Sequence, residues 1–360
     1  MIFSSLGRYF FRRYMVTVGW FFAGICAIIF LIDLSENSGR FSSIPDFGYT
    51  GALWLTLLRL PQFLQQTVPF IALFSGMATM IALNRTYELV VTRAAGISVW
   101  QFISPFLIGA LLTGIFAVSV LSPLSAIATR TALNIESELR GQQPRGFTNI
   151  PWLHDIGGDY DTILGAKGVD STGTQLTDAV FFHLNDQGDV TLRQDATSAT
   201  LKDGYWLLNN VIETATGQPT RNLETVQVRT NLTREFVQER LSRIETISFF
   251  EIPERIRAAR SFGLSTRALE TQFHSLLSIP FMLIAMTFIA GTVSLKFSRF
   301  NQSKVMIFGG IMTGFMLYVV SVLVRVFGSS GAVPPFVATW TPVVIALSVG
   351  VTILLHQEDG

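Results

Sequence analysis

Six uncharged, apolar stretches constrain this chain more than any other feature. A helix needs about 20 mostly apolar residues to cross the hydrocarbon layer of a bilayer. The stretches lie near residues 14–32, 60–83, 100–121, 273–295, 305–324 and 336–355. The sequence therefore predicts six transmembrane helices, three before a long intervening segment and three after it. The first stretch is too long and too aromatic for a signal peptide, and we expect it to be retained as a helix.

The charged residues gather between the third and fourth stretches. Only 14% of the 360 residues are charged, about half the share that soluble domains carry. Residues 122–270 hold 15 of the 26 Lys and Arg and 19 of the 25 Asp and Glu. This distribution indicates a membrane protein with one polar insertion and excludes a cytosolic globular protein. Because the insertion carries a net negative charge, it offers no basic surface for nucleic acid.

Lysine and arginine in the short loops predict the orientation, since cytoplasmic loops carry an excess of these residues. Basic residues precede the first stretch, join the second to the third, and join the fourth to the fifth. They are Arg8, Arg12 and Arg13, then Arg85 and Arg93, then Lys296, Arg299 and Lys304. We therefore expect both termini in the cytoplasm and the polar insertion on the opposite side. The acidic tail at 358–359 runs against this bias, but acidic residues have little weight in it.

The insertion changes its pattern along its length. Residues 122–140 have a helical spacing of apolar residues, as if the third span continued out of the membrane. Residues 147–250 contain short alternating runs separated by turn sequences such as 185–188 and 202–204, which indicates an all-β domain. A short helix near 253–263 is expected to return the chain to the membrane. The predicted domains are 1–140 (helices one to three), 141–263 (β domain and return segment) and 264–360 (helices four to six).

Three sequence motifs make the predicted architecture more specific. They are Arg-Tyr-Phe-Phe-Arg-Arg at 8–13, Tyr-Glu-Leu-Val-Val-Thr-Arg-Ala-Ala-Gly at 87–96, and Phe-His-Ser-Leu-Leu-Ser-Ile-Pro at 273–280. With them the chain resembles the LptF/LptG permease family over almost its whole length. Two further segments, 32–34 and 333–340, look more like the LptG branch, and the LptF role remains the alternative.

The resemblance implies an inner-membrane permease of an ABC transporter that extracts lipopolysaccharide. The implied partners are an LptF-like permease, an LptB-like ATPase dimer and an LptC-like periplasmic protein. It also implies a periplasmic β domain of jelly-roll form whose apolar interior accepts acyl chains. Two other functions remain open: a scaffold that anchors a periplasmic domain, and a membrane-embedded enzyme that modifies lipids.

The loop between the second and third stretches, near 84–98, is the most informative segment. Its charged and apolar residues lie three and four apart, which predicts a short helix with a mixed face and a C-terminal glycine. The resemblance implies a coupling helix whose Glu88 offers a carboxylate to an arginine of the ATPase. The candidate coupling residues are Arg85, Glu88, Leu89, Arg93 and Gly96. The alternative is a solvated helical hairpin whose own arginine and glutamate pair with each other.

Enzymatic and metal chemistry have little support in the sequence. A Gly-x-x-x-x-Gly-Lys-Ser/Thr loop is missing, so ATP must be handled by a partner. The four histidines are far apart and share no ligand spacing with the single cysteine, Cys26. We therefore predict no catalytic residues, no metal and no cofactor.

Four arginines fall near the outward ends of the predicted spans, where cations are scarce. They are Arg40, Arg59, Arg130 and Arg325. A guanidinium binds phosphate or carboxylate in a fork, so these residues are candidates for a lipid headgroup. The alternative, given equal weight, is that they snorkel or pair with Asp33, Glu36, Asp46 or Glu136.

Relatives often carry lysines at the outward end of the first helix, whereas this chain has Phe30, Asp33 and Glu36 there, with Arg40 beyond. A headgroup with fewer phosphates, or contacts from the second permease, would account for that difference. The resemblance also implies that the first and fifth spans border a lateral opening. The candidate gate residues are Phe30, Gly309, Gly310 and Gly314, and static packing of the glycines is the alternative.

Overall fold

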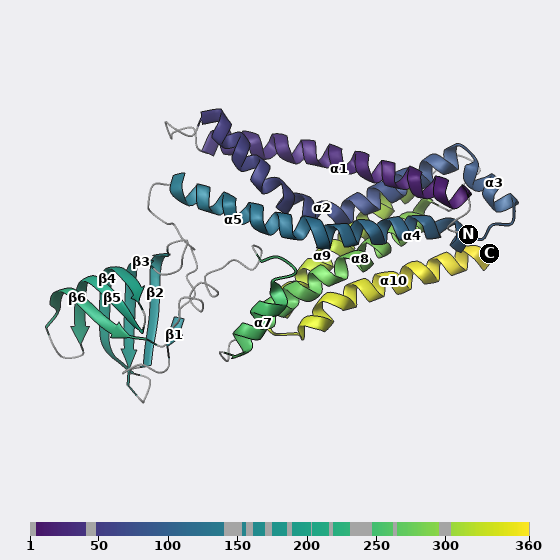
Figure 1. Ribbon diagram of the computed structural model, residues 1–360. Helices are drawn as coiled ribbons and strands as arrows, with labels where there is room; N and C mark the ends of the chain where they lie inside the picture. Colours follow the sequence, from purple (N-terminus) through teal and green to yellow (C-terminus); the bar gives the residue numbers. More distant parts are fainter. Residues whose placement is uncertain are drawn as a thin grey trace. The chain divides into compact units, whose positions relative to one another are not determined.

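The computed structural model describes residues 5–40, 48–139, 153–155, 161–169, 175–185, 189–202, 204–215, 219–230, 247–261, 265–294 and 304–359. Asp46, Lys296 and Arg299 lie outside these ranges. The chain divides into two compact units (Figure 1). The first comprises Met1–Thr131 with Ile244–Gly360, and the second comprises Ala132–Arg243.

Helices α1 to α4 form the first half of the helical unit. They span Ser5–Arg40 (α1), Gly48–Arg85 (α2), Glu88–Ala94 (α3) and Val99–Phe116 (α4). A π-helical turn, η1 (Ala117–Leu121), joins α4 to α5 (Ser122–Leu139). The predicted continuation of the third span as a helix is therefore confirmed.

The second half begins with the short return helix α7 (Ile252–Ser261), close to its predicted place. It continues with α8 (Arg267–Ser294), α9 (Lys304–Ser330) and α10 (Pro335–Asp359). Among the described segments, six helices are long and apolar enough to cross a membrane, which confirms the six predicted apolar helices. α1 runs past its predicted end at residue 32 because buried polar residues, Asp33 and Asn37, extend the helix.

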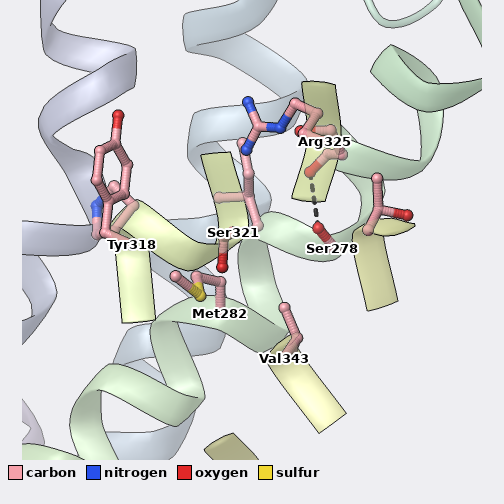
Figure 2. Close-up of a pocket in the computed structure, with 10 residues that line it drawn as sticks. Ser278, Met282, Tyr318, Ser321, Arg325 and Val343 are labelled. Carbon is pink, nitrogen blue, oxygen red and sulfur yellow. Dashed lines mark hydrogen bonds between the residues drawn. The ribbon is translucent and has the colours of Figure 1, made fainter. Parts of the chain in front are cut away.

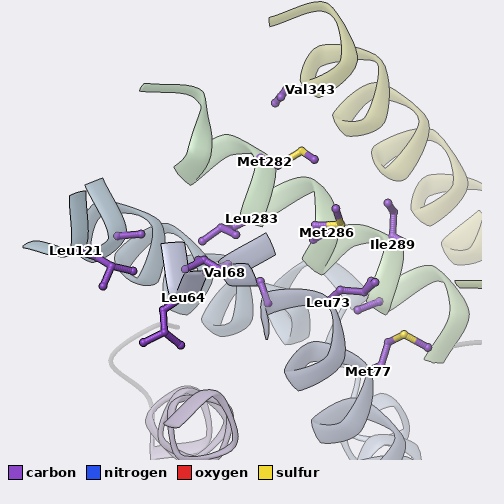
Figure 3. Packing of buried hydrophobic residues seen from close by; sticks show 14 of the residues in the cluster. Leu64, Val68, Leu73, Met77, Leu121, Met282, Leu283, Met286, Ile289 and Val343 are labelled. Atoms are coloured by element: carbon purple, nitrogen blue, oxygen red, sulfur yellow. The ribbon is translucent and has the colours of Figure 1, made fainter. Parts of the chain in front are cut away.

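Helix α8 lies at the centre of the helical unit, in contact with α2, α4, α9 and α10. Its Met282, Leu283 and Met286 pack with apolar residues of α2 and η1 (Figure 3). α4 approaches α8 closely because it has a glycine at the crossing. A Cβ at Gly114 would lie 2.4 Å from Cα of Pro280. Leu, Met and Gly at these positions thus form a dense helix–helix core.

A second cluster near the N-terminus of α1 is rich in aromatic residues. Phe10 packs against Phe102 with ring centroids 5.0 Å apart, and Tyr14 against Phe106 at 5.5 Å. Leu89 of α3 belongs to the same cluster. The cluster therefore joins α1, α3 and α4 at one end of the helical unit.

The outer faces of α1 and α9 are apolar and exposed. Trp20 of α1 is 74% exposed and Val305 of α9 is 77% exposed. Exposed apolar surface of this extent is costly in water and marks contact with lipid or with other helices. This is the surface that a membrane helix is expected to present.

The second unit contains six described strands. They are β1 (Leu153–Asp155), β2 (Asp161–Val169), β3 (Gln175–Leu184), β4 (Val190–Lys202), β5 (Tyr205–Ala215) and β6 (Arg221–Arg229). All pair antiparallel with their neighbours in chain order, as in a meander. The predicted inserted β domain is confirmed. Closure into a jelly roll stays a prediction, because residues 231–246 lie outside the described ones.

Buried and more exposed residues alternate along β3, β4 and β5, so one face of the sheet is buried. Phe181 and Trp206 are fully buried and meet edge to face at 6.2 Å. Gly204 has a φ of +84°, which L residues rarely adopt, and it turns the chain between β4 and β5. This agrees with the predicted turn at 202–204, of which residue 203 lies outside the described residues.

A polar row lies on the same face as this apolar core. The His183 ring contacts Thr162 Oγ1 through Nδ1 (3.0 Å) and Gln194 Oε1 through Nε2 (3.1 Å). Gln194 in turn donates from Nε2 to Glu213 Oε2 (2.9 Å). Side chains from β2, β3, β4 and β5 are therefore linked across the sheet.

Candidate functional site

The short helix α3 has well-defined ends between α2 and α4. Tyr87 precedes it in a left-handed conformation, with φ of 60°. At its C-terminus the N–H of Gly96 donates to the carbonyl of Arg93 (2.9 Å), and that of Ile97 to Thr92 (3.3 Å). These two bonds, with a φ of +79° at Gly96, form a Schellman motif. Gly96 therefore ends the helix, as its spacing predicted.

Helix α3 presents two different faces. Leu89 is only 3% exposed and packs in the aromatic cluster near Phe10. On the opposite side, Tyr87 and Val91 are 68% and 67% exposed. Arg85 and Arg93 are exposed as well. Leu89 was predicted among the coupling residues, and in this structure it anchors the helix, whereas the exposed residues are free to meet another protein.

Glu88 forms an ion pair with a residue that the sequence analysis did not select. Arg13 Nη1 of α1 donates to Glu88 Oε1 at 2.7 Å, and Thr86 Oγ1 donates to the same oxygen at 2.8 Å. Arg13 Nη1 also lies 2.7 Å from the hydroxyl oxygen of Tyr9. Arg85 makes no ion pair with a carboxylate of the described residues. The hairpin alternative, in which the arginine and glutamate of the loop pair with each other, is therefore not what the structure contains.

The environment keeps Glu88 ionised. Partial burial acts to raise the pKa of its carboxyl group, but hydrogen bonds from Thr86 and Arg13 outweigh that effect and lower the pKa below its usual value. The side chains of Arg13 and Glu88 are 29% and 31% exposed. A charged carboxylate is thus held at the rim of α3, with part of its surface still accessible to solvent.

Sequence reasoning missed Arg13 because three arginines precede the first span without any visible difference. The motif at 8–13 indicates that this region is important, but it does not predict which of its arginines is buried. In the structure Arg8 and Arg12 are exposed, whereas Arg13 is half-buried beside α3. Helical geometry separates them, since adjacent residues on a helix face different directions.

Three of the four candidate headgroup arginines have acidic partners in this chain. Arg59 Nη1 lies 3.3 Å from Asp33 Oδ1, and Arg40 pairs with Glu36 one helical turn before it. Arg130 of α5 pairs with Glu251, just before α7. The pairing alternative therefore describes these three residues, with Asp33 and Glu36 as predicted partners for two of them.

Arg325 differs from the other three. It lies on α9 and lines a small pocket that is open to the outside (Figure 2). The other polar lining residues are hydroxyl-bearing: Ser275, Ser278, Tyr318, Ser321 and Thr339. Within the described part of the chain, no carboxylate pairs with Arg325. A guanidinium among hydroxyl groups, without an internal counter-ion, is suited to an anion.

The candidate gate residues divide between packed and exposed positions. A Cβ at Gly314 would lie 2.4 Å from Leu73 of α2, and one at Gly310 would lie 2.7 Å from Val293 of α8. Gly309 has open space around it. Phe30 packs against the core that surrounds α8. Gly310 and Gly314 therefore serve close packing of α9 in this structure, and Gly309 lies on its outer face.

Comparison with known proteins gives one family match. A family model described as lipopolysaccharide export system permease LptF/LptG matches residues 8–356. A search of curated proteins gave no match. The match includes α3, Arg13, Arg325 and the β strands that the structure describes.

Proposed function

Since the chain belongs to the LptF/LptG family of lipopolysaccharide export permeases, we propose that it is the permease subunit of an ABC transporter. It extracts lipopolysaccharide from the periplasmic leaflet of the inner membrane for export to the outer membrane. ATP hydrolysis on a partner subunit drives the extraction. On the evidence of 32–34 and 333–340, the chain takes the LptG role, and an LptF-like permease is its membrane partner.

Helix α3 is the observation that carries this proposal. It is a short helix in a loop between two long apolar helices, capped at its end and anchored by buried Leu89. Its outer face exposes Tyr87, Val91 and Arg93. A rigid, exposed element at the end of two membrane helices is suited to transmit motion from a soluble partner. The partner in this proposal is an LptB-like ATPase dimer, which docks on α3 and contacts Glu88.

The orientation follows from the basic loops. Both termini and α3 face the cytoplasm, and the β unit lies in the periplasm, where an LptC-like protein accepts lipid from it. The exposed apolar faces of α1 and α9 support contact with the second permease and with lipid. The two faces carry Trp20 and Val305, which are among the most exposed apolar residues of the described chain.

The lipid headgroup is assigned to Arg325 in this proposal. Arg40, Arg59 and Arg130 already have carboxylate partners, so each would lose an ion pair on binding an anion. Arg325 would instead gain an ion pair on binding an anion. The hydroxyl groups of Ser275 and Tyr318 can donate to phosphate or carboxylate oxygens in the pocket around Arg325. Those of Ser278, Ser321 and Thr339 donate to backbone carbonyls of their own helices.

The proposal is tested by purifying the chain with its partners from native membranes. Glu88→Ala should leave the chain inserted but weaken ATPase copurification, or uncouple ATP hydrolysis from lipid release, because a partner arginine loses its carboxylate. Glu36→Gln, an exposed acid at the other end of α1, is the matched control and should behave as wild type. Unchanged assembly and transport in Glu88→Ala would refute the coupling assignment. Purification of the wild-type chain without any ATPase would favour the scaffold function instead.

A further inference from the structure

The ion pair between Arg13 and Glu88 joins residues 75 positions apart in the sequence, one on α1 and one on α3. We propose that Arg13 is a positioning residue that couples α3 to α1, so that a displacement of α3 moves the adjacent end of α1. This inference rests on the proposed function and deepens it, because it names the path by which ATPase docking reaches a membrane helix.

Arg13 differs from the other two arginines of the 8–13 motif in its contacts. Its Nη1 lies 2.7 Å from both Glu88 Oε1 and Tyr9 Oη, so one nitrogen joins α3 to the neighbouring turn of α1. Arg8 and Arg12 point to solvent. Thr86, at the end of the α2–α3 connection, donates to the same Glu88 oxygen and fixes the carboxylate.

An apolar contact reinforces the polar one. Leu89 follows Glu88 directly and lies in the same buried cluster as Phe10 of α1. Phe10 is held by Phe102 of α4 with ring centroids 5.0 Å apart. Glu88 is therefore joined to α1 by an ion pair, and Leu89 belongs to the buried cluster that contains Phe10 of α1. Of these two contacts, the charged one is the more directional.

The other end of α1 is tied to α2. Asn37 Nδ2 donates to Asp33 Oδ2 (2.8 Å) and lies 3.1 Å from Thr56 Oγ1, and Arg59 completes this buried group. Asn37 and Thr56 are fully buried. The N-terminal end of α1 also packs on α4 through Phe10. We expect a displacement of α3 to be passed to this end of α1 through the Arg13–Glu88 pair. The exposed apolar face of α1 around Trp20 would then change its contacts with lipid or a partner helix.

The Arg13–Glu88 ion pair is partly exposed to solvent, which matters for telling a coupling role from a stabilising one. Ion pairs with this much solvent contact contribute little to folding. Loss of Arg13 should therefore leave the chain folded and inserted. Its effect should be on the ratio of lipid released to ATP hydrolysed.

The experiment uses the whole transporter complex in vesicles that contain lipopolysaccharide. Arg13→Gln should retain the ATPase subunit but release about fivefold less lipid per ATP, the change that corresponds to an ion pair of about 1 kcal/mol. Arg13→Lys should restore part of the ratio, because it keeps the charge. Arg12→Gln removes the same charge one residue away, on the exposed side, and should match wild type. A wild-type ratio in Arg13→Gln would overturn the inference.

A second measurement follows the helix directly. Spin labels are attached at Arg8→Cys on α1 and Thr352→Cys on α10, in a Cys26→Ser background, since both positions are exposed. In the complex, ATP binding should change the distance between the labels, and Arg13→Gln should reduce that change. An equal change in both proteins would contradict the inference.

The same complexes separate the two proposals. If Glu88→Ala assembles and transports normally, the coupling function itself fails. If Glu88→Ala disrupts coupling while Arg13→Gln transports with the wild-type ratio, only the role of Arg13 is refuted.

Discussion

The carboxylate of Asp33 and the guanidinium of Arg59 form a 3.3 Å ion pair between α1 and α2. Asp33 is only 5% exposed, and its second oxygen accepts a hydrogen bond from Asn37 at 2.8 Å. Nearly buried charges are tolerated when they are paired and hydrogen-bonded. Arg59 is therefore part of the structure that holds α1 on α2, and its pairing explains how a cation is accommodated there.

Replacing Asp33 should destabilise the helical unit. Asp33→Ala removes the nearly buried carboxylate that Arg59 and Asn37 both contact, at a cost of about 2 kcal/mol. Thermal unfolding of the purified chain in detergent micelles measures the loss. Glu36→Gln removes an exposed ion pair on the same helix and should change stability by less than about 1 kcal/mol. Equal effects of the two substitutions would show that the Asp33–Arg59 pair is not structural.

The glycines on the packed helices should respond according to their neighbours. A Cβ at Gly114 would lie 2.4 Å from the Pro280 backbone, which a side-chain rotation cannot relieve. Gly114→Ala should therefore destabilise the chain by about 1–3 kcal/mol. Gly309→Ala has open space and should be neutral or stabilising by less than about 1 kcal/mol, because alanine favours a helix. Unfolding in the same detergent compares them, and a neutral Gly114→Ala would contradict the close α4–α8 contact.

The buried histidine of the sheet should make the β unit sensitive to acid. Burial lowers the pKa of His183, and its hydrogen bond with Gln194 and the charge of Glu213 offset this only in part. An unfolded histidine binds a proton near pH 6.5, whereas the folded one does so only at lower pH. The contribution of neutral His183 to the stability of the β unit is therefore complete above about pH 6.5. Below that pH the stability falls, by at most about 1.4 kcal/mol per pH unit.

Protection factors of the β3–β5 amides, measured by hydrogen exchange in the full chain, report this effect. They correct for the intrinsic pH dependence of exchange. His183→Gln keeps hydrogen-bonding groups but cannot titrate, and its protection should change less between pH 7.5 and 5.5. The same pH dependence in His183→Gln would assign the effect to another group.

The large elements were predictable because their signals are long. An apolar stretch of bilayer length has few alternatives to a transmembrane helix. Strands β3 to β5 alternate strongly, and the turn at Gly204 has its own signature. Helix ends were less predictable: polar Asp33 and Asn37 would be read as a loop, but they are buried against α2 and the helix continues.

The site was only partly predictable, because ion pairs depend on which helix faces meet. The spacing of Glu88 and Arg85 allows a pair within the loop, and only the fold shows that Arg13 of α1 is nearer. The four outward arginines look alike in the sequence. They differ in space because carboxylates lie beside Arg40, Arg59 and Arg130, whereas Arg325 lies among hydroxyl groups.

That difference gives a prediction about lipid binding. If Arg325 holds an anionic headgroup, Arg325→Gln removes a charge-assisted hydrogen bond worth about 1.5–3 kcal/mol. Affinity for lipopolysaccharide should then fall at least about tenfold. Lipid bound per purified complex, measured at limiting lipid, reports the loss, while basal ATP hydrolysis should continue.

Arg40→Gln is the matched control for Arg325, because it removes the same charge from an arginine that already pairs with Glu36. It should leave the bound lipid unchanged. Ser275→Ala, on α8, removes one hydroxyl donor from the pocket and should weaken binding less than Arg325→Gln does, since an uncharged donor contributes less. Equal lipid occupancy in Arg325→Gln and Arg40→Gln would refute the assignment of the headgroup to Arg325.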